Sequence, residues 1–202
     1  MARLPFLLLL LAALAAPARA EPAEAMLERG LAAAGQGDFA AAAENFRQAA
    51  EAGNAVAQVN LALLYARGTG VPRDPALAAR YWRMAADQGV ALAQARLALL
   101  LWRGTAVPLD AREAFRLAER AAGQGEPEGF SVLGLLYFNG QGAPRNMIEA
   151  WYWLSLVERH HPDAGQREWA RTSRMRAANS MSLDQIAATR RRVEDYRMPA
   201  AR

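Results

Sequence analysis

The sequence predicts an all-α protein in which antiparallel helix pairs stack into a right-handed α-solenoid. Gly53, Gly89 and Gly125 lie 36 residues apart, and the stretches between them keep one order of apolar, glycine, proline and acidic positions. A fixed period of roughly 20–50 residues is typical of stacked supersecondary units rather than of one closed globule. The alanine-rich composition favours closely packed helices over strands. The absence of cysteine excludes disulfides and thiolate metal sites.

The first 20 residues have the pattern of a secretory signal peptide. Arg3 precedes an apolar run over residues 4–16, and Ala18-Arg19-Ala20 fits the small-residue pattern of a cleavage site. The run has about 13 residues, fewer than the roughly 20 that a membrane-spanning helix needs. We therefore expect cleavage between Ala20 and Glu21, a periplasmic mature protein and no stable membrane span after leader removal. The alternative is a leader retained as an anchor.

Repeats at 54–89, 90–125 and 126–161 form the centre of the predicted solenoid. Residues 21–53 before them predict a helix pair that resembles a tetratricopeptide unit, with Gly35 as the C-cap of its first helix and Asp38 as the N-cap of its second. Residues 162–202 after them predict two capping helices, the last opened by a capping box at 182–185. An arginine-rich, polar final helix suits the end of a solenoid, which must stay soluble.

Each repeat carries its own helix punctuation. A left-handed glycine is expected to end the first helix, and a proline followed by an acidic or amide N-cap is expected to open the second. Glu113 and Glu149 stand three residues after the later N-caps and predict capping boxes. The residues in question are Gly68, Gly104 and Gly140, then Pro72, Pro108 and Pro144, then Asp74, Asp110 and Asn146.

The repeated pattern Ala-x-x-x-Leu-Ala/Gly-x-Leu-Tyr-x-x-Gly-x-Gly-Val-x-x-Asp, followed by an aromatic-rich helix and Ala-Ala-x-x-Gly, resembles the Sel1-like repeats, which are related to tetratricopeptide repeats. It covers Asn54 to about Leu156. The second repeat departs at Ala106, where a glycine is expected, and the third at Ala143 and Asn146. The resemblance implies a solenoid whose first helices line the concave side. It also implies adaptor or regulatory roles, commonly in bacterial envelope assembly, signalling or host interaction.

Chemistry-bearing patterns are scarce, so we expect no catalytic residue, cofactor or metal. The acidic residues of the turns recur with the repeat and are explained by helix capping. His160 and His161 point about 100° apart on a helix, a poor chelate, and a helix C-terminus favours their cationic form. No lysine is present, which excludes a Ser-x-x-Lys site and a phosphate-binding lysine loop. No basic stripe with base-reading elements suggests nucleic acid as a partner.

Helical spacing places a mixed stripe on the first helix of each repeat, turned away from its apolar columns. We expect this stripe to bind a protein or peptide partner, with arginines meeting acidic groups and leucines supplying apolar area. A half-buried packing face is the alternative. The predicted binding residues are Asn60, Leu63, Arg67, Arg96, Leu99, Arg103, Val132, Leu135 and Asn139.

The favoured function is therefore an exported, non-enzymatic scaffold that captures a partner on its concave face. Two other classes remain open. One is a cell-wall enzyme or penicillin-binding protein. The other is a polyanion or membrane-surface binder that acts through the arginines of the C-terminal helix, where 190–192 is the densest run. Most aromatic residues are expected to pack in the core, whereas Trp102 and Phe138 share a less certain column.

Overall fold

The computed structural model describes residues 22–199, and within that range it contains helices and no strands. The predicted leader and its cleavage site lie outside the described residues. The helices are α1 (Ala23–Gly35), α2 (Phe39–Glu51), α3 (Ala55–Arg67), α4 (Pro75–Asp87), α5 (Ala91–Arg103), α6 (Ala111–Gly123), α7 (Pro127–Asn139), α8 (Met147–His160), α9 (Ala164–Ala178) and α10 (Leu183–Asp195).

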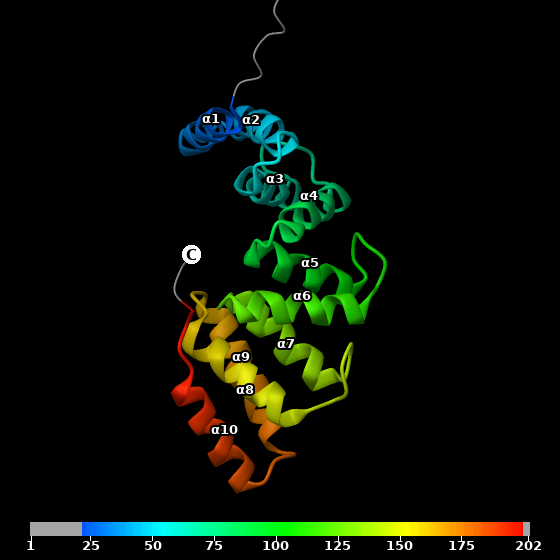
Figure 1. The fold of residues 1–202 in the computed structure, drawn as a ribbon, viewed down its shortest axis with the longest axis vertical. Helices are drawn as coiled ribbons and strands as arrows, with labels where there is room; N and C mark the ends of the chain where they lie inside the picture. Colours follow the sequence, from blue (N-terminus) through cyan, green and yellow to red (C-terminus); the bar gives the residue numbers. More distant parts are fainter. Residues whose placement is uncertain (1–21, 200–202) are drawn as a thin grey trace, which may run out of the picture.

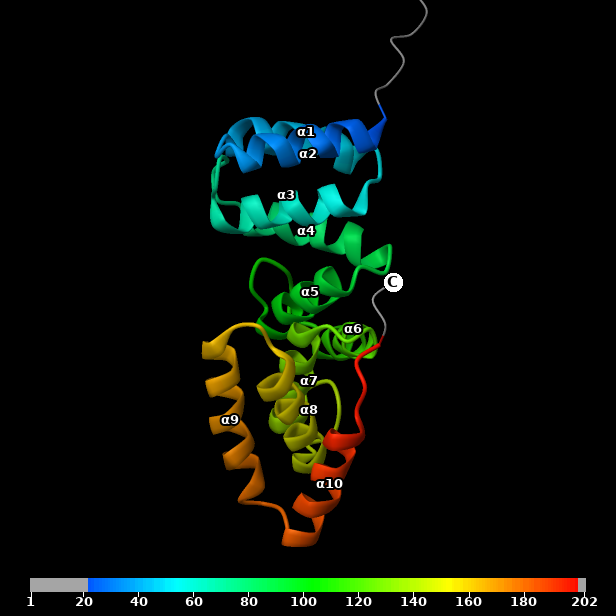
Figure 2. The same ribbon diagram turned by 90° about the vertical axis from the view of Figure 1, so that its left-hand side faces the viewer.

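Consecutive helices pair and the pairs stack along the long axis of the molecule (Figures 1 and 2). Pairs α1–α2, α3–α4, α5–α6 and α7–α8 pack most closely within themselves, and each second helix packs on the first helix of the next pair. This arrangement confirms the predicted all-α solenoid. From α1 to α8, a position repeated every 36 residues therefore recurs on the same helix of each pair.

Local capping explains where the repeated helices begin and end. Asp74 and Asp110 accept hydrogen bonds from the backbone N–H groups of Leu77 and Glu113, at 2.9 Å in both cases. Gly68, Gly104 and Gly140 adopt left-handed conformations after α3, α5 and α7, because only glycine enters this region without a Cβ penalty. The predicted punctuation of the three repeats is therefore confirmed.

Three details of the predicted caps are wrong. Gly35 is the last residue of α1, and the left-handed glycine of that turn is Gly37, at φ +80°. The carboxylates of Glu113 and Glu149 pair with arginines of other helices, Arg83 and Arg192, instead of turning back to their own N-caps. A glutamate three residues after an N-cap can also reach a neighbouring helix. A charged arginine there is a stronger hydrogen-bond partner than the backbone N–H of the N-cap.

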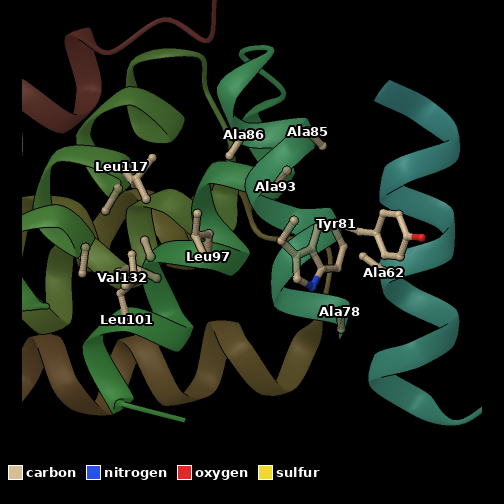
Figure 3. Packing of buried hydrophobic residues seen from close by; sticks show 14 of the residues in the cluster. Ala62, Ala78, Tyr81, Ala85, Ala86, Ala93, Leu97, Leu101, Leu117 and Val132 are labelled. Carbon is tan, nitrogen blue, oxygen red and sulfur yellow. The ribbon is translucent and has the colours of Figure 1, made fainter. Parts of the chain in front are cut away.

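The core consists of small residues that bring helices together and leucines that fill the space between them. Ala62, Ala98 and Gly134 occupy one buried column, and Leu61, Leu97 and Leu133 occupy the next. Burying one such leucine contributes about 2 kcal/mol. Figure 3 shows the close approach that alanine permits, with Tyr81 of α4 lying beside Ala62 of α3. Tyr81, Trp82 and Trp151 are buried as predicted, whereas Tyr65, Tyr137 and Trp153 are half-buried.

Glutamine pairs join successive repeats at two places. Gln88 donates to the side-chain oxygen of buried Gln58 at 2.8 Å, and 36 residues later Gln124 donates to Gln94 at 2.9 Å. The third repeat carries Phe130 and His160 in these two columns. There the hydrogen-bonded pair is replaced by rings, with Tyr196 edge-on to Phe130 at 5.8 Å and tilted against His160 at 5.8 Å.

The last two helices do not pair as the earlier ones do. Both α9 and α10 pack mainly on α8, one on each side of it (Figure 2). The column that holds Gly68, Gly104 and Gly140 holds Arg176 here, so no left-handed glycine stops α9 and the helix continues to Ala178. Four residues then separate α9 from α10, whereas seven separate α3 from α4. Residues 196–199 return toward the α6–α7 turn, with Pro199 packed near Gly125.

Candidate functional site

Five of the nine predicted binding residues meet around one cavity of about 590 Å³. They are Arg96, Leu99 and Arg103 of α5 with Val132 and Leu135 of α7. The third wall comes from the α8–α9 turn and α9. The other residues that line the cavity are Ala95, Trp102, Glu128, Ser131, His161, Asp163, Gln166 and Trp169. Pockets of this size typically hold one small ligand or a few side chains of a partner.

An ion pair connects two walls of the cavity. Arg96 of α5 donates through Nη2 to the carboxylate of Glu128 on α7. Burial raises the pKa of Glu128, and the Arg96 charge only partly offsets this effect, while nearby Glu126 adds to it. Arg96 therefore meets its acidic partner within the chain, which corrects the expectation that its whole guanidinium is reserved for another molecule. Its Nε atom is buried and has no hydrogen-bond partner among the described residues.

Trp102 and Arg103 form the end of the cavity where α5 stops. The indole N–H of Trp102 donates to the side-chain oxygen of Gln141 in the next turn, at 2.5 Å, which fixes the ring. The Arg103 guanidinium carbon lies 5.8 Å from the centre of that ring. Trp102 and Phe138 are both half-buried, and each has an arginine over its ring, since Arg176 lies 5.5 Å from Phe138.

The two histidines at the end of α8 face different surroundings. His161 lines the cavity, and its Nδ1 accepts the backbone N–H of Asp163 at 3.1 Å. Burial lowers the pKa of His161, and Asp163 only partly restores it. Burial and the neighbouring Arg159 lower the pKa of His160. Burial therefore opposes the charged form of both rings, contrary to the expectation that a helix C-terminus favours it.

The remaining four predicted residues lie outside this cavity. Asn60 donates its side-chain amide to the carbonyl of Val56 within α3, at 2.9 Å. Leu63 is half-buried against the core, and Arg67 is exposed at the end of α3. Asn139 lines a smaller hollow of about 170 Å³, together with Phe138 and Arg176. The stripe of the first repeat thus has the predicted residue types without the surrounding walls.

Sequence analysis missed the wall that α9 provides. The 36-residue period continues past the third repeat, which places Gly165, Trp169 and Ala170 in the columns of Ala57, Leu61 and Ala62. Ser182 likewise follows Asn146 by 36 residues and caps α10. Extending the alignment would have identified α9 as a further first helix. Nothing in the alignment indicates that its Trp169 and Gln166 face Leu99 and Leu135.

Two other features of the described chain bear on function. No group of three or more His, Asp or Glu residues in 22–199 is arranged to hold a metal ion. Across the same residues, no helix has both the length and the apolar character needed to cross a membrane. In the basic run of α10, Arg192 is engaged with Glu149 at 2.8 Å and lies over Tyr152, which leaves Arg190 and Arg191 exposed.

Comparison with known protein families identifies the repeat. The family model for the Sel1 repeat matches four times, at residues 22–54, 55–90, 91–126 and 132–156. The first match covers the helix pair that the sequence analysis compared with a tetratricopeptide unit. A search of curated proteins finds no match to this chain.

Solved structures with the same fold include two Sel1-type proteins. A protective antigen of uropathogenic Escherichia coli that displays an SLR fold is 34% identical, with a TM-score of 0.63; the alignment covers 71% of this chain and 32% of the antigen. This chain thus spans about a third of the antigen's length. A Sel1 repeat protein from Oxalobacter formigenes is 24% identical over 87% of this chain and 80% of its own, also with a TM-score of 0.63. With four repeat matches over most of the described helices, the chain belongs to the Sel1 repeat family.

Proposed function

We propose that this protein is an exported scaffold that binds a segment of a partner protein in the cavity between α5, α7 and α9. Sel1 repeats are generally protein-interaction scaffolds and typically non-enzymatic. The observation that carries the proposal is the convergence of five predicted stripe residues with the α9 wall around about 590 Å³. Partner binding would use buried apolar anchors surrounded by polar contacts, as protein interfaces usually do.

The apolar part of the cavity suits an anchor side chain. Leu99 and Leu135 occupy the same column on α5 and α7, and Trp169 of α9 lies on the third side. All three are half-buried, so each still presents apolar area that a partner would remove from water. Covering about 100 Å² of such area contributes roughly 2.5 kcal/mol before the costs of association.

Export and a periplasmic location form part of the same proposal. They rest on the signal-peptide pattern of residues 1–20. We infer that the mature scaffold acts in envelope assembly or regulation without a catalytic step of its own.

Site-specific photo-crosslinking in the envelope of the producing cell tests the proposal. A photoreactive amino acid is placed at Leu99, and the matched control carries it at Leu63, one repeat earlier in the same column. We expect a discrete adduct from Leu99 that is absent or at least fivefold weaker from Leu63. The adduct should also be lost in the Arg96→Glu, Arg103→Glu double variant. Equal adducts from Leu99 and Leu63, or adducts unaffected by the double variant, would reject the cavity as the binding site.

A further inference from the structure

The charged groups of the cavity are unevenly engaged. Among its carboxylates, Glu128 is held by Arg96, and Asp163 accepts the backbone N–H of Gln166 at 2.8 Å as the N-cap of α9. Among its cations, Arg103 is exposed and forms no ion pair with any carboxylate in the described part of the chain. Both carboxylates of the cavity are therefore engaged within the protein, Glu128 by an ion pair and Asp163 as a helix cap, whereas the Arg103 guanidinium contacts only the ring of Trp102 among the described residues.

A second donor lies deeper in the same cavity. The Nε–H of Arg96 is buried and unpartnered, although Nη2 of the same guanidinium holds Glu128. A buried donor without an acceptor is unfavourable, so a ligand oxygen toward which the Arg96 side chain turns removes that penalty on binding. Hydrogen bonds from guanidinium to carboxylate are among the stronger ones in proteins. Both arginines thus favour an anionic oxygen ligand.

The spacing of these groups indicates what kind of segment fits. Arg96 and Arg103 lie seven residues apart on α5, about 10 Å along the helix axis at roughly 1.5 Å per residue. Leu99 lies between them and lines the cavity with both. An extended chain advances roughly 3.3 Å per residue, so about three of its residues span the distance between the two arginines, and about one or two separate an apolar side chain beside Leu99 from an acidic one at either arginine.

We propose, resting on the function proposed above, that the cavity selects an internal protein segment in which an aspartate or glutamate lies within about three residues of a large apolar side chain. The apolar side chain packs among Leu99, Leu135 and Trp169. The carboxylate pairs with Arg103 at the rim or accepts from the Arg96 Nε–H. Basic segments are rejected, because they bring a positive charge to Arg103 and find Glu128 already paired with Arg96 and Asp163 already engaged as the N-cap of α9.

The repeat provides a matched control for this charge. Arg67 stands 36 residues before Arg103, at the same last position of its helix, and is equally exposed. It lies outside the cavity. Arg67→Glu therefore makes the same change of residue and net charge as Arg103→Glu, at a position that lacks the cavity and the Trp102 ring.

Selection from random twelve-residue peptides, displayed between constant linkers so that no peptide terminus is free, tests the proposal. The baits are the full mature chain and its Arg103→Glu, Arg103→Gln and Arg67→Glu variants, each checked for native helicity. We expect acidic residues to be enriched at least threefold near an apolar position for the wild type and Arg67→Glu. This enrichment should vanish with Arg103→Gln, and lysine or arginine should replace the acid with Arg103→Glu.

Affinities of one selected peptide complete the test. Replacing its acidic residue by the amide should weaken binding to the wild type at least tenfold and binding to Arg103→Gln less than twofold. Enrichment of neutral or basic peptides, or the same loss with Arg67→Glu, overturns the inference while leaving a peptide-binding scaffold intact. Failure of every bait to enrich any peptide overturns the inference as well. Absence of the Leu99 crosslink in the protein with both arginines intact would instead contradict the proposed function.

Discussion

The turn between α3 and α4 and the turn between α9 and α10 occupy equivalent places in the repeat, with different consequences. In the first, Gly68 stops α3 and a seven-residue loop returns α4 along it. In the second, Arg176 stands in the glycine column, α9 runs on, and α9 and α10 pack on opposite sides of α8. The helix that lacks this left-handed glycine is thus also the one that does not pair with its successor and that forms a wall of the cavity.

The position of α9 also distinguishes the stripe of the first repeat from the stripe of the second. Asn60, Leu63 and Arg67 lie on a regular pair and line neither hollow described above, whereas Arg96, Leu99 and Arg103 face α9. The residue types in the two sets are similar. We conclude that a similar stripe becomes a candidate binding site only where a neighbouring element gives it a further side.

The largest expected effect comes from breaking a regular turn. Gly142 has φ +78°, and a Cβ at that position would lie 2.1 Å from the carbonyl oxygen of Ala111. Gly142→Ala should therefore cost about 3 kcal/mol, from left-handed strain and backbone overlap together. Urea unfolding followed by circular dichroism measures the change. A variant as stable as the wild type would show that this turn does not hold α7 and α8 together.

Ala106 offers the reverse experiment in the same column. It adopts a left-handed conformation at φ +67°, where the neighbouring repeats have glycine. Ala106→Gly should stabilise the protein by about 1 kcal/mol by removing that strain. The same unfolding measurement applies, and a destabilised variant would indicate that the methyl group makes compensating contacts.

Removing the wall should separate binding from folding. Trp169→Ala takes away the largest side chain that α9 brings to the cavity, and we expect at least a tenfold loss of affinity for a selected peptide, about 1.4 kcal/mol. Arg67→Ala on the regular pair serves as the control and should change affinity less than twofold. Titration with a fluorescent peptide measures both. Equal losses in the two variants would remove α9 from the site.

Acid should destabilise the junction beneath α9 and α10. The pKa of both His160 and His161 is lowered by burial, so the unfolded chain takes up protons before the folded protein does. Stability is then complete above the ordinary histidine pKa of about 6.5 and falls as the pH drops below it. Thermal melts between pH 7.5 and 5 should show this slope. His160→Gln, which restores the residue of Gln124, should reduce it, and an unchanged slope would exclude His160 as a source.

The smallest effect is expected where α10 is tied to α8. Glu149→Gln weakens the pairing with Arg192, which is 48% exposed. Such partly solvated pairs contribute about 0.5 kcal/mol, and the melting temperature should fall by about 1–2 °C. Glu113→Gln, which weakens the pair with Arg83 between regular repeats, should give a similar shift. A much larger shift for Glu149→Gln would show that α10 depends on this contact.

Local signals predicted the repeats well and the contacts between them poorly. Asp74, Asp110 and Gly140 act within a few residues of their own positions, so their roles follow from neighbouring sequence. The pairing of Glu128 with Arg96 depends instead on how α7 is placed beside α5. The number of residues between the two side chains does not indicate how far apart they lie in the folded protein. The Gln58–Gln88 and Gln94–Gln124 pairs repeat with the 36-residue period, but their hydrogen bonds depend on the stacking of one helix pair on the next.

The sequence by itself determined the family of the fold, the helix boundaries and the row of first helices that carries the stripe, because capping, turn conformation and helical periodicity are local properties. Only the tertiary structure decided that α9 forms a wall of the cavity beside α5 and α7, that Arg96 is ion-paired within the protein while Arg103 is not, and that His161 is buried and His160 half-buried. Those outcomes depend on burial and on distances between residues far apart in the chain. Helix packing sets the position of the cavity. The same packing pairs Arg96 with Glu128 and leaves Arg103 without a carboxylate partner in the described part of the chain.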